Sequence, residues 1–451
     1  ITKHNFLVRS VNELPEIMRK AFYIASTGRP GPVLVDIPVD VSRAVLEDYQ
    51  YPRSVLIRSY NPVVDCDEKQ IDIAIEYLSK ARKPLIFAGG GVIHAGAHEE
   101  LRVFAEKTNI PVTTSLMGLG VFPSEHELFI GMPGMHGAKT ANYAIQEADL
   151  ILSIGVRFDD RVTGFVATFA PNASIVHIDI DPVTISKIVK VDVAIVGDAK
   201  VALKMLIEKA FSRSRDEWNE KVSGWKGKKL FNYTPSESVI KPQAVIEALY
   251  NFTGGKAVVA TEVGQHQMWT AHYFKCNTPR TLLTSGGLGT MGFGLPAAMG
   301  AAMAKLGKPV IVIGGDGSIQ MNIQELATLS INKIPVKIVI LNNTFLGMVR
   351  QWQELFYNHR YSSTCLRGGY LCNECVGTDK CKRKYVPDFI TVAKGYDIPA
   401  FRAETPQQVL QVIKDGFTVE GPALMEFIVS PEENVFPMVP AGKPLDDILE
   451  G

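Results

Sequence analysis

The stretch GGDGSIQMNIQELATLSINKIPVKIVILNN, residues 314–343, decides the fold class. It predicts a buried strand ending at Asp316, an amphipathic helix, and a second buried strand ending at Asn342 and Asn343. In a strand–helix–strand crossover both strands run parallel, so their ends lie at the same edge of the sheet. Asp316 and Asn343 can then offer oxygens to one hard cation, and Mg²⁺ prefers a few protein oxygens together with phosphate oxygens.

The glycines of this stretch favour an anion beside that cation. Gly315 and Gly317 let the backbone approach a diphosphate, and the N-terminus of the following helix attracts negative charge. The alternative is an ordinary crossover turn that carries Asp and Asn by chance, which we would prefer for a lone GDG. The paired asparagines at the next strand end favour the magnesium-diphosphate interpretation.

Buried strands alternate with helical patterns along the whole chain, which predicts α/β domains with parallel sheets flanked by helices. We expect the end of a first domain at residues 1–45, a central domain at 62–210 and a third domain at 235–451. A cysteine-rich insertion is expected at 365–386, and residues 212–238 read as a charged connector.

The first unit is expected to be incomplete. It shows one amphipathic helix pattern at residues 11–22 and one strand at 31–41, and one helix with one strand cannot make a core. We therefore expect the beginning of this domain to be missing from the sequence.

Composition excludes several classes of protein. The 451 residues are 46% hydrophobic and 21% charged, and 47 Lys+Arg balance 47 Asp+Glu. A zero net charge argues against nucleic acid or a membrane surface as partner. No apolar run approaches the roughly 20 residues that span a bilayer. Six cysteines without a secretory signal fit a reducing compartment, so we expect a cytoplasmic protein.

Three further stretches carry a family resemblance. NNTFLGMVRQWQELFYNHRYSST (342–364), EVGQHQMW (262–269) and TSGGLGTMGFGLPAA (284–298) are similar to the catalytic large subunits of the acetolactate synthase (acetohydroxyacid synthase) family. These are enzymes dependent on thiamine diphosphate. The resemblance extends from Ile1 to PMVPAGKP (437–444) and is interrupted mainly by the cysteine-rich run.

The resemblance implies roles for residues of the third domain. Asp316, Asn343 and the backbone carbonyl of Phe345 would hold magnesium. Met291 would support the bent cofactor and Met348 would contact it, although core packing is the ordinary role of methionine. Together with Gln265, Arg161 and Trp352, these two methionines form the expected catalytic set. The remaining residues expected to line the cofactor are Val263, Gly264, His266, Gly289, Gly317 and Ser318.

The central domain resembles a flavin-binding domain. AGGG (88–91) alone is a weak phosphate-loop signal, but GVRFDDRVTG (155–164) separates this family from pyruvate decarboxylases and from catabolic acetolactate synthases. Its arginines can neutralise phosphate, and acidic side chains at strand ends can bind ribityl hydroxyls. By the resemblance the FAD is structural. The residues expected to contact FAD are Arg29, Gly89, Gly90, Gly91, Ser115, Leu116, Met117, Met135, His136, Gly155, Arg157, Asp159, Asp160, Arg161, Asp179 and Asp198.

The resemblance also implies a reaction. Family members decarboxylate pyruvate on thiamine diphosphate and join the two-carbon unit to pyruvate or 2-ketobutyrate, in branched-chain amino acid biosynthesis. Arg161 would bind the acceptor's carboxylate and Trp352 would bound its alkyl group. A homodimer or homotetramer and a small regulatory subunit are implied as partners. No glutamate here matches the family's catalytic glutamate of the first domain, so we expect the chain alone to be inactive.

The cysteine-rich run supports other interpretations. Cys365, Cys372, Cys375 and Cys381 have the spacing C-x6-C-x2-C-x5-C, which fits zinc, an iron–sulfur cluster, local disulfides or free thiols. We interpret it as an insertion near the active-site entrance. Competing functions are a flavin enzyme of the pyruvate oxidase or glyoxylate carboligase type, a non-catalytic truncated relative, and a metal-binding interaction module.

Overall fold

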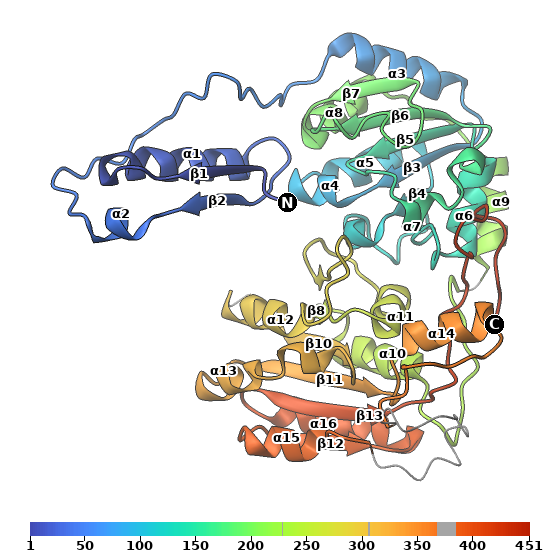
Figure 1. Ribbon diagram of the computed structural model, residues 1–451. Coiled ribbons are helices and arrows are strands. Elements are labelled where there is room, and N and C mark those ends of the chain that lie inside the picture. The colour runs from blue at the N-terminus through green and yellow to red at the C-terminus, as the bar shows by residue number, and fades with distance from the viewer. Residues whose placement is uncertain (228, 305–306, 368–384) are drawn as a thin grey trace.

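The computed structural model describes residues 1–227, 229–304, 307–367 and 385–451. Its strands form three parallel sheets of two, five and six strands, with helices packed on them (Figure 1). The predicted α/β class with parallel sheets is confirmed. One sheet falls within each of the three predicted units, whose boundaries remain predictions.

The first unit stands apart from the two larger domains on an extended connection (Figure 1). Strand β1 was not predicted, because HNFL is short and has only two apolar residues. Helix α2 occupies the end of the run predicted as a strand, where Pro38 precedes its first turn. The elements are β1 (His4–Leu7), η1 (Val11–Glu13), α1 (Leu14–Ser26), β2 (Val33–Asp36) and α2 (Val39–Arg43).

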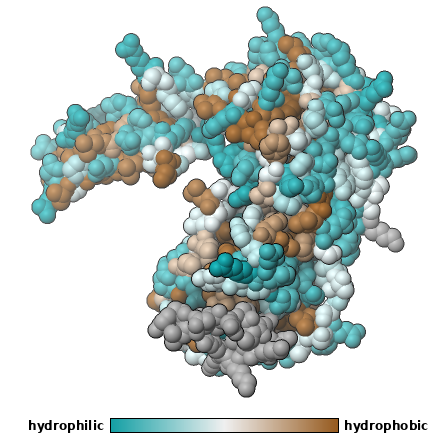
Figure 2. Space-filling model, turned by 45° about the vertical axis from the view of Figure 1, so that its right-hand side comes forward, coloured by the Kyte–Doolittle hydropathy of each residue, from teal (hydrophilic) through white to brown (hydrophobic). Residues whose placement is uncertain are grey.

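This unit exposes apolar side chains. Leu7 and Leu34 lie on the two paired strands and are each about half exposed, and Phe22 and Val39 are exposed too. Figure 2 shows hydrophobic surface on the projecting unit. The two-stranded sheet therefore has little core of its own.

The central domain is built on a sheet of order β4-β3-β5-β6-β7. The chain moves from β3 to β4 on one side and then to β5 on the other, so a crevice opens between the ends of β3 and β5. Its elements are α3 (Glu68–Lys80), β3 (Pro84–Ala88), α4 (Gly90–His94), α5 (His98–Thr108), β4 (Val112–Thr114), η2 (Leu116–Gly118), α6 (Lys139–Glu147), β5 (Leu150–Ile154), α7 (Asp160–Thr163), η3 (Val166–Thr168), β6 (Ser174–Asp179), β7 (Val193–Val196) and α8 (Ala199–Lys209).

The third domain is built on a sheet of order β12-β13-β11-β10-β8-β9. The direction of the connections changes at β8, which lies between β9 and β10, so the second crevice is at the ends of β8 and β10. Its elements are α10 (Pro242–Thr253), β8 (Val258–Thr261), α11 (Gln265–Tyr273), β9 (Leu282–Leu283), α12 (Gly294–Met303), β10 (Val310–Gly315), η4 (Ile319–Asn322), α13 (Glu325–Ile331), β11 (Val336–Asn342), α14 (Gly347–Phe356), α15 (Phe389–Gly395), β12 (Ala400–Ala403), η5 (Pro406–Gln408), α16 (Val409–Thr418) and β13 (Ala423–Ile428).

The predicted connector at residues 212–238 contains a helix, α9 (Asp216–Lys226), so its assignment as a charged linker was wrong in part. Trp218 is buried and its indole N–H donates to the carbonyl of Pro84 at 3.0 Å. Trp218, Val222 and Trp225 recur at helical spacing. The many charges between them concealed that signal.

The two larger domains pack directly on each other. One hydrophobic cluster joins Phe87 of the central sheet to Val245 and Val339 of the third domain. The amide of Val439, near the C-terminus, donates to the Met135 carbonyl at 2.7 Å. The strand ends of both domains are thus held in one fixed arrangement.

Helix α3 is short and amphipathic. The 13-residue helix α3 buries Ile71, Ala74 and Leu78 on one face. Within the described ranges, no helix is long and apolar enough to cross a membrane.

Candidate cofactor site

The structure brings Asp316 and Asn343 together at the ends of neighbouring strands. Strands β10 and β11 are parallel, with Gly315 opposite Leu341, so the two residues follow at the same sheet edge. Asp316 is only 1% exposed, and its Oδ2 has no hydrogen-bond partner. Burial raises the pKa of Asp316 to about 7, although the backbone N–H groups of Thr344 and Gly317 act against that rise. A buried oxygen of this kind needs a cation or a proton.

Asn343 is fixed by its own turn. Its Oδ1 accepts the N–H of Phe345 at 3.0 Å, and its Nδ2 donates to Gln265 Oε1 at 3.4 Å. An amide oxygen has two lone pairs, so one stays free for a cation. The three predicted magnesium ligands therefore lie on the Asp316 turn and the Asn343–Phe345 turn.

A closed metal cage is not seen. Among the residues the structure describes, no three His, Cys, Asp or Glu side chains gather to hold a metal ion. One carboxylate, one amide and one carbonyl are a donor set for a cation that takes its other ligands from phosphate and water.

Glycines and a histidine shape the wall beside Asp316. A Cβ on Gly315 would lie 2.9 Å from His266 Nδ1, and Gly264, with φ +153°, would place one 2.8 Å from His266 Cε1. Burial lowers the pKa of His266 to about 4, so the ring is neutral, and its Nε2 has no partner. The glycines therefore let the backbone pack closely against the ring, and Nε2, the ring nitrogen left without a partner, can accept a hydrogen bond from a ligand.

Gln265 locks helices α11 and α14 together. Its Nε2 donates to Gln351 Oε1 at 2.9 Å and to the Glu433 carbonyl at 3.0 Å. A Cβ on Gly347 would lie 2.1 Å from Gln265 Oε1, so a side chain at the start of α14 would displace the Gln265 amide. This contact sets the helix that carries Met348 and Trp352.

The two predicted side chains of α14 differ in their surroundings. Met348 is partly buried and packs on the large hydrophobic cluster, as an ordinary core methionine does. Trp352 is partly exposed and lies edge-on to Phe356, with ring centroids 5.3 Å apart.

Met291 lies on a glycine-rich loop, residues 285–292, whose Gly289 and Gly292 have φ of +65° and +89°. The carboxylate of Glu262 holds the end of this loop, accepting the N–H of Gly292 at 2.5 Å and of Leu295 at 3.0 Å. Sequence reasoning missed Glu262. An acidic residue at the end of the buried run VVATE was the available signal.

The predicted flavin glycines meet in the crevice of the central sheet. Gly91 N–H donates to the Gly155 carbonyl at 3.0 Å. A Cβ on either residue would lie 2.6 Å from the other's Cα, and Gly155 has φ +59°. Gly89 is packed in the same way, because a Cβ added to it would lie 2.3 Å from the Gly155 carbonyl oxygen. The two strand ends thus pack backbone against backbone, and a side chain at any of these three positions would clash.

Two predicted flavin residues reach the glycine-rich loop of the third domain. A Cβ added to Gly286 would lie 2.6 Å from Met117 Sδ, so Met117 packs against this glycine. A Cβ added to Gly287 would lie 4.0 Å from a guanidinium nitrogen of Arg157. The candidate flavin and diphosphate sites therefore share residues 285–292 as a common wall.

The acidic strand-end residues have structural roles in the protein. Asp198 caps α8 by accepting the N–H of Lys200 at 2.8 Å, and Asp159 caps α7 through Arg161 N–H at 3.2 Å. Asp179 accepts the N–H of Asp181 at 2.8 Å, and burial raises the pKa of Asp179. Both oxygens of each carboxylate can accept more than one bond, so a ligand contact stays open to them.

The remaining predicted flavin residues lie on the same sheet edge or face it. Arg29 of the first unit pairs with Asp181 at 3.3 Å, beside the end of β6. Ser115 N–H donates to the Ala88 carbonyl at 3.0 Å, which places Ser115 and Leu116 next to Gly89.

A second group joins α7 to the third domain. Met135 N–H donates to the Arg161 carbonyl at 2.8 Å. The His136 carbonyl accepts a bond from the His272 ring at 2.6 Å. The Arg161 guanidinium is exposed and pairs with Asp160 at 3.3 Å, so it is available to an anion.

Cys365 is a free thiol beside the Asn343 turn, whereas Cys372, Cys375 and Cys381 lie outside the described residues. Leu346 N–H donates to the Thr364 carbonyl at 2.8 Å. On the far side of the run, Tyr385 lies against the Asp316 carboxylate. The described ends of the predicted insertion therefore both adjoin the candidate site.

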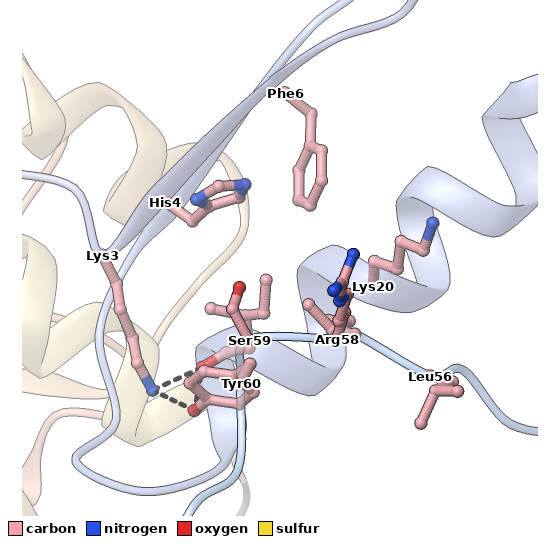
Figure 3. Close-up of a pocket in the computed structure, with 10 residues that line it drawn as sticks. Lys3, His4, Phe6, Lys20, Leu56, Arg58, Ser59 and Tyr60 are labelled. Carbon is pink, nitrogen blue, oxygen red and sulfur yellow. Dashed lines mark hydrogen bonds between the residues drawn. The ribbon is translucent and has the colours of Figure 1, made fainter.

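A separate cavity of about 350 Å³ lies between β1, α1 and residues 56–60 (Figure 3). Figure 3 shows the Lys3 ammonium bound to Tyr60, whose hydroxyl is 2.7 Å away, and it also donates to the Ile24 carbonyl at 2.6 Å. The cavity's main cation is therefore already satisfied. None of the predicted site residues lines it.

Comparison with known proteins places this geometry in a family. The chain is 46% identical to the acetolactate synthase large subunit of Corynebacterium glutamicum, over 99% of this chain and 70% of that relative. This chain belongs to the acetolactate synthase large-subunit family. It is likewise 40% identical to the acetolactate synthase isozyme 3 large subunit of Escherichia coli, over 99% of this chain and 77% of the relative. The maize acetolactate synthase 1, chloroplastic, is 44% identical over 100% of this chain and 70% of its own length.

Two family models match parts of this acetolactate synthase family member. The thiamine pyrophosphate enzyme central domain matches residues 71–206, and the C-terminal domain that binds thiamine pyrophosphate (thiamine diphosphate) matches residues 262–427. The second match contains Glu262, His266, Asp316 and Asn343. The resemblance drawn from the sequence is confirmed.

The residues present fit thiamine diphosphate with a divalent cation. The orphaned Asp316 oxygen suits the cation through which a diphosphate would be held. At the crevice of the central sheet, the Gly91 and Gly155 backbones pack on each other, so neither residue places a side chain between the two strand ends.

Proposed function

We propose that this protein is an acetolactate synthase. It decarboxylates pyruvate and joins the two-carbon unit to a second pyruvate or to 2-ketobutyrate, giving 2-acetolactate or 2-aceto-2-hydroxybutyrate for branched-chain amino acid biosynthesis. The observation that carries the proposal is the buried Asp316 carboxylate oxygen without a partner, beside the Asn343 turn and the glycine wall. The relatives named above support it.

The third domain would hold thiamine diphosphate through magnesium. Asp316, the free lone pair of Asn343 Oδ1 and the Phe345 carbonyl would bind the cation, and the backbone at Gly315 and Gly317 would face the diphosphate. When bound, thiamine diphosphate supplies a carbanion stabiliser for the decarboxylation and the carbon–carbon bond. The protein supplies position and electrostatics.

The protein's own residues would orient the reaction and exclude water. His266 is buried and neutral, so its unpartnered Nε2 can accept a hydrogen bond without adding charge. Gln265 is fixed by Gln351 and does not need to reorganise when ligands bind. Met291 and Met348 add apolar surface on two sides of the site.

The central domain would hold FAD as a structural group. The crevice between Gly91 and Gly155 would face its phosphates, and Arg157 would offset their charge. Because Met117 and Arg157 also meet the glycine-rich loop, a bound flavin would stiffen a wall of the thiamine diphosphate site. This accounts for a flavin in an enzyme that carries out no net oxidation.

The substrate acceptor would be selected by two domains. Arg161 on α7 has an exposed guanidinium for a 2-keto acid carboxylate, and Trp352 on α14 presents a partly exposed ring for an alkyl group. The homodimer or homotetramer, the small regulatory subunit and the cytoplasmic location remain predictions.

Acetolactate formation tests the function. The protein, with whatever residues precede Ile1 in its reading frame, is given pyruvate, thiamine diphosphate, Mg²⁺ and FAD, and the product is measured with and without 2-ketobutyrate. We expect acetolactate without oxygen consumption. Absence of product with all cofactors present contradicts the proposal, and oxygen-dependent acetate formation would support the pyruvate oxidase type.

The cysteine-rich run is tested separately by metal analysis. We predict that the protein carries zinc or iron, and that the double variant Cys372→Ser, Cys375→Ser loses it. A metal-free parent protein contradicts this prediction without affecting the proposed reaction.

A further inference from the structure

We propose that Glu262 is a positioning residue that preforms the cofactor site by fixing the glycine-rich loop 285–292 to the end of strand β8. The inference rests on the proposed function for the identity of the ligand. It adds a role for a side chain at which sequence reasoning assigned none.

Glu262 is fully buried, with 0% exposure. Its two carboxylate oxygens each accept one backbone N–H, Oε2 from Gly292 at 2.5 Å and Oε1 from Leu295 at 3.0 Å. Leu295 is in the first turn of α12, whose N-terminal dipole favours a negative charge. A buried carboxylate that accepts two N–H groups is strongly directional, since leaving either donor unpaired costs free energy.

The middle of the loop held in this way carries few buried side chains. Leu288 is 92% exposed, and the residues around it are glycines. The loop ends at Gly292, and both backbone polar groups of Gly292 are hydrogen-bonded. Its carbonyl accepts from Asn322 Nδ2 at 2.6 Å, and its N–H donates to Glu262. The position of Met291 therefore follows from these two contacts.

The main chain of Glu262 connects this loop to the diphosphate side. Its N–H donates to the Ile313 carbonyl of β10 at 3.0 Å, and its backbone hydrogen-bonds the His266 ring. A Cβ on Gly294 would lie 2.6 Å from the Glu262 nitrogen, so α12 begins directly against the strand end. One residue thus joins the Met291 loop to the wall formed by His266.

The side chain and the main chain of Glu262 serve different parts of the ligand. The side chain holds the end of the loop and the first turn of α12 and lies against Gly314 of β10, whereas the His266 wall depends on the backbone. Changing the side chain should therefore weaken binding of the whole cofactor and spare binding of its diphosphate alone. A purely structural role would weaken both or neither.

The experiment compares Glu262→Gln, Glu262→Asp and wild type by calorimetric titration of the protein with whatever residues precede Ile1 in its reading frame. The probes are thiamine diphosphate and inorganic pyrophosphate, each with Mg²⁺. Gln is nearly isosteric but turns an NH₂ toward one backbone N–H, which by the usual cost of one charged hydrogen bond should weaken thiamine diphosphate binding about tenfold. Pyrophosphate affinity should change less than about twofold, and Asp should recover part of the loss.

Amide hydrogen exchange in the ligand-free chain gives an independent readout. Exchange at Gly292 and Leu295 should speed up in Glu262→Gln. The matched control is Glu147→Gln, which removes a carboxylate bound to Lys83 at 3.1 Å and Lys221 at 2.5 Å in the central domain. It should alter neither loop exchange nor cofactor affinity.

The outcomes separate the two proposals. Thiamine diphosphate binding by wild type with an unchanged Glu262→Gln affinity overturns the role of Glu262 and leaves the proposed function standing. Equal losses for both ligands, or unchanged loop exchange, also overturn it. A wild-type chain that binds pyrophosphate but not thiamine diphosphate overturns both proposals.

Discussion

Asn342 Nδ2 donates a 2.7 Å hydrogen bond to Glu426 Oε1, inside the third sheet. Glu426 is 1% exposed, and its Oε2 accepts from Arg402 Nε at 2.7 Å. Successive side chains of a strand point to opposite sides, so fixing Asn342 inward turns Asn343 toward the Asp316 turn. The ion pair of Glu426 with Arg402 thus fixes Asn342 and leaves Asn343 as the asparagine that faces the candidate site.

Glu426→Gln should destabilise the protein while leaving its fold intact. The amide keeps one acceptor for Asn342 or Arg402 but leaves the other contact mismatched, and the guanidinium loses its counter-charge. We expect a loss of about 2 kcal/mol in the free energy of unfolding. Urea unfolding followed by circular dichroism measures it.

The matched control for that change is Glu404→Gln at an exposed position of the same domain. It should change the free energy of unfolding by no more than about 0.5 kcal/mol. If the two variants are equally stable, the pair at Glu426 does not support the strand end.

Asp316 gives the metal-free protein a stability that depends on pH. Its folded pKa of about 7 lies above the ordinary aspartate value of 3.8, so the folded state binds the proton more tightly. The stabilisation of the folded state by protonated Asp316 is complete below pH 4 and is lost as the pH rises toward 7. The contribution of Asp316 should therefore lower the melting temperature of the metal-free chain as the pH rises from 4 to 7.

Asp316→Asn should therefore have opposite effects with and without ligand. At pH 8 the metal-free variant should melt higher than metal-free wild type, because no buried charge forms. Mg²⁺ with thiamine diphosphate should raise the melting temperature of wild type and leave the variant unchanged. Thermal scans at pH 5 and pH 8 check both signs, and an equal ligand response in the two proteins would exclude Asp316 as a ligand of the cation.

His272 predicts an acid-sensitive contact between the two larger domains. Its ring donates to the His136 carbonyl at 2.6 Å and stacks on Phe231, and burial lowers the pKa of His272 to about 4 and that of His136 to about 3. Because the pKa of each ring is lower in the folded state, the neutral rings stabilise the folded protein above about pH 6.5. This stabilisation is lost as the pH falls toward 4. Each such histidine costs up to about 1.4 kcal/mol per pH unit in this window.

His272→Gln should lower the melting temperature at pH 7.5, because the stacking is lost, but should make its decline between pH 6.5 and pH 4 shallower. His94→Gln, at an exposed position, should keep the wild-type slope. Parallel declines in wild type and His272→Gln would show that the contact with His136 is not acid-sensitive.

The pairing of Asp316 with Asn343 could be predicted because both follow continuous apolar strands joined by one helix, and a crossover fixes their relation. The end of the buried run VVATE was a signal for Glu262 itself, but its contacts could not be predicted, because Gly292 and Leu295 lie 30 and 33 residues away and bond through backbone groups with no sequence signature. Helix α9 was concealed for a different reason: charges hid the spacing of Trp218 and Val222. Local periodicity is readable from the sequence, whereas contacts that close a loop depend on the tertiary fold.

The crevice of the central sheet gives a test of the flavin site. Gly155→Ala adds a methyl group 2.6 Å from the Gly91 Cα at a residue with φ +59°, so it combines backbone strain with a clash between main chains. Gly96→Ala is the matched control, because Gly96 has φ +61° and an added Cβ would have no atom within 4 Å.

The control should lose about 1 kcal/mol in the free energy of unfolding and bind FAD like wild type. Gly155→Ala should lose about 3 kcal/mol and fail to retain FAD, measured by flavin absorbance after gel filtration. Equal FAD retention by the two variants would move the flavin away from this crevice.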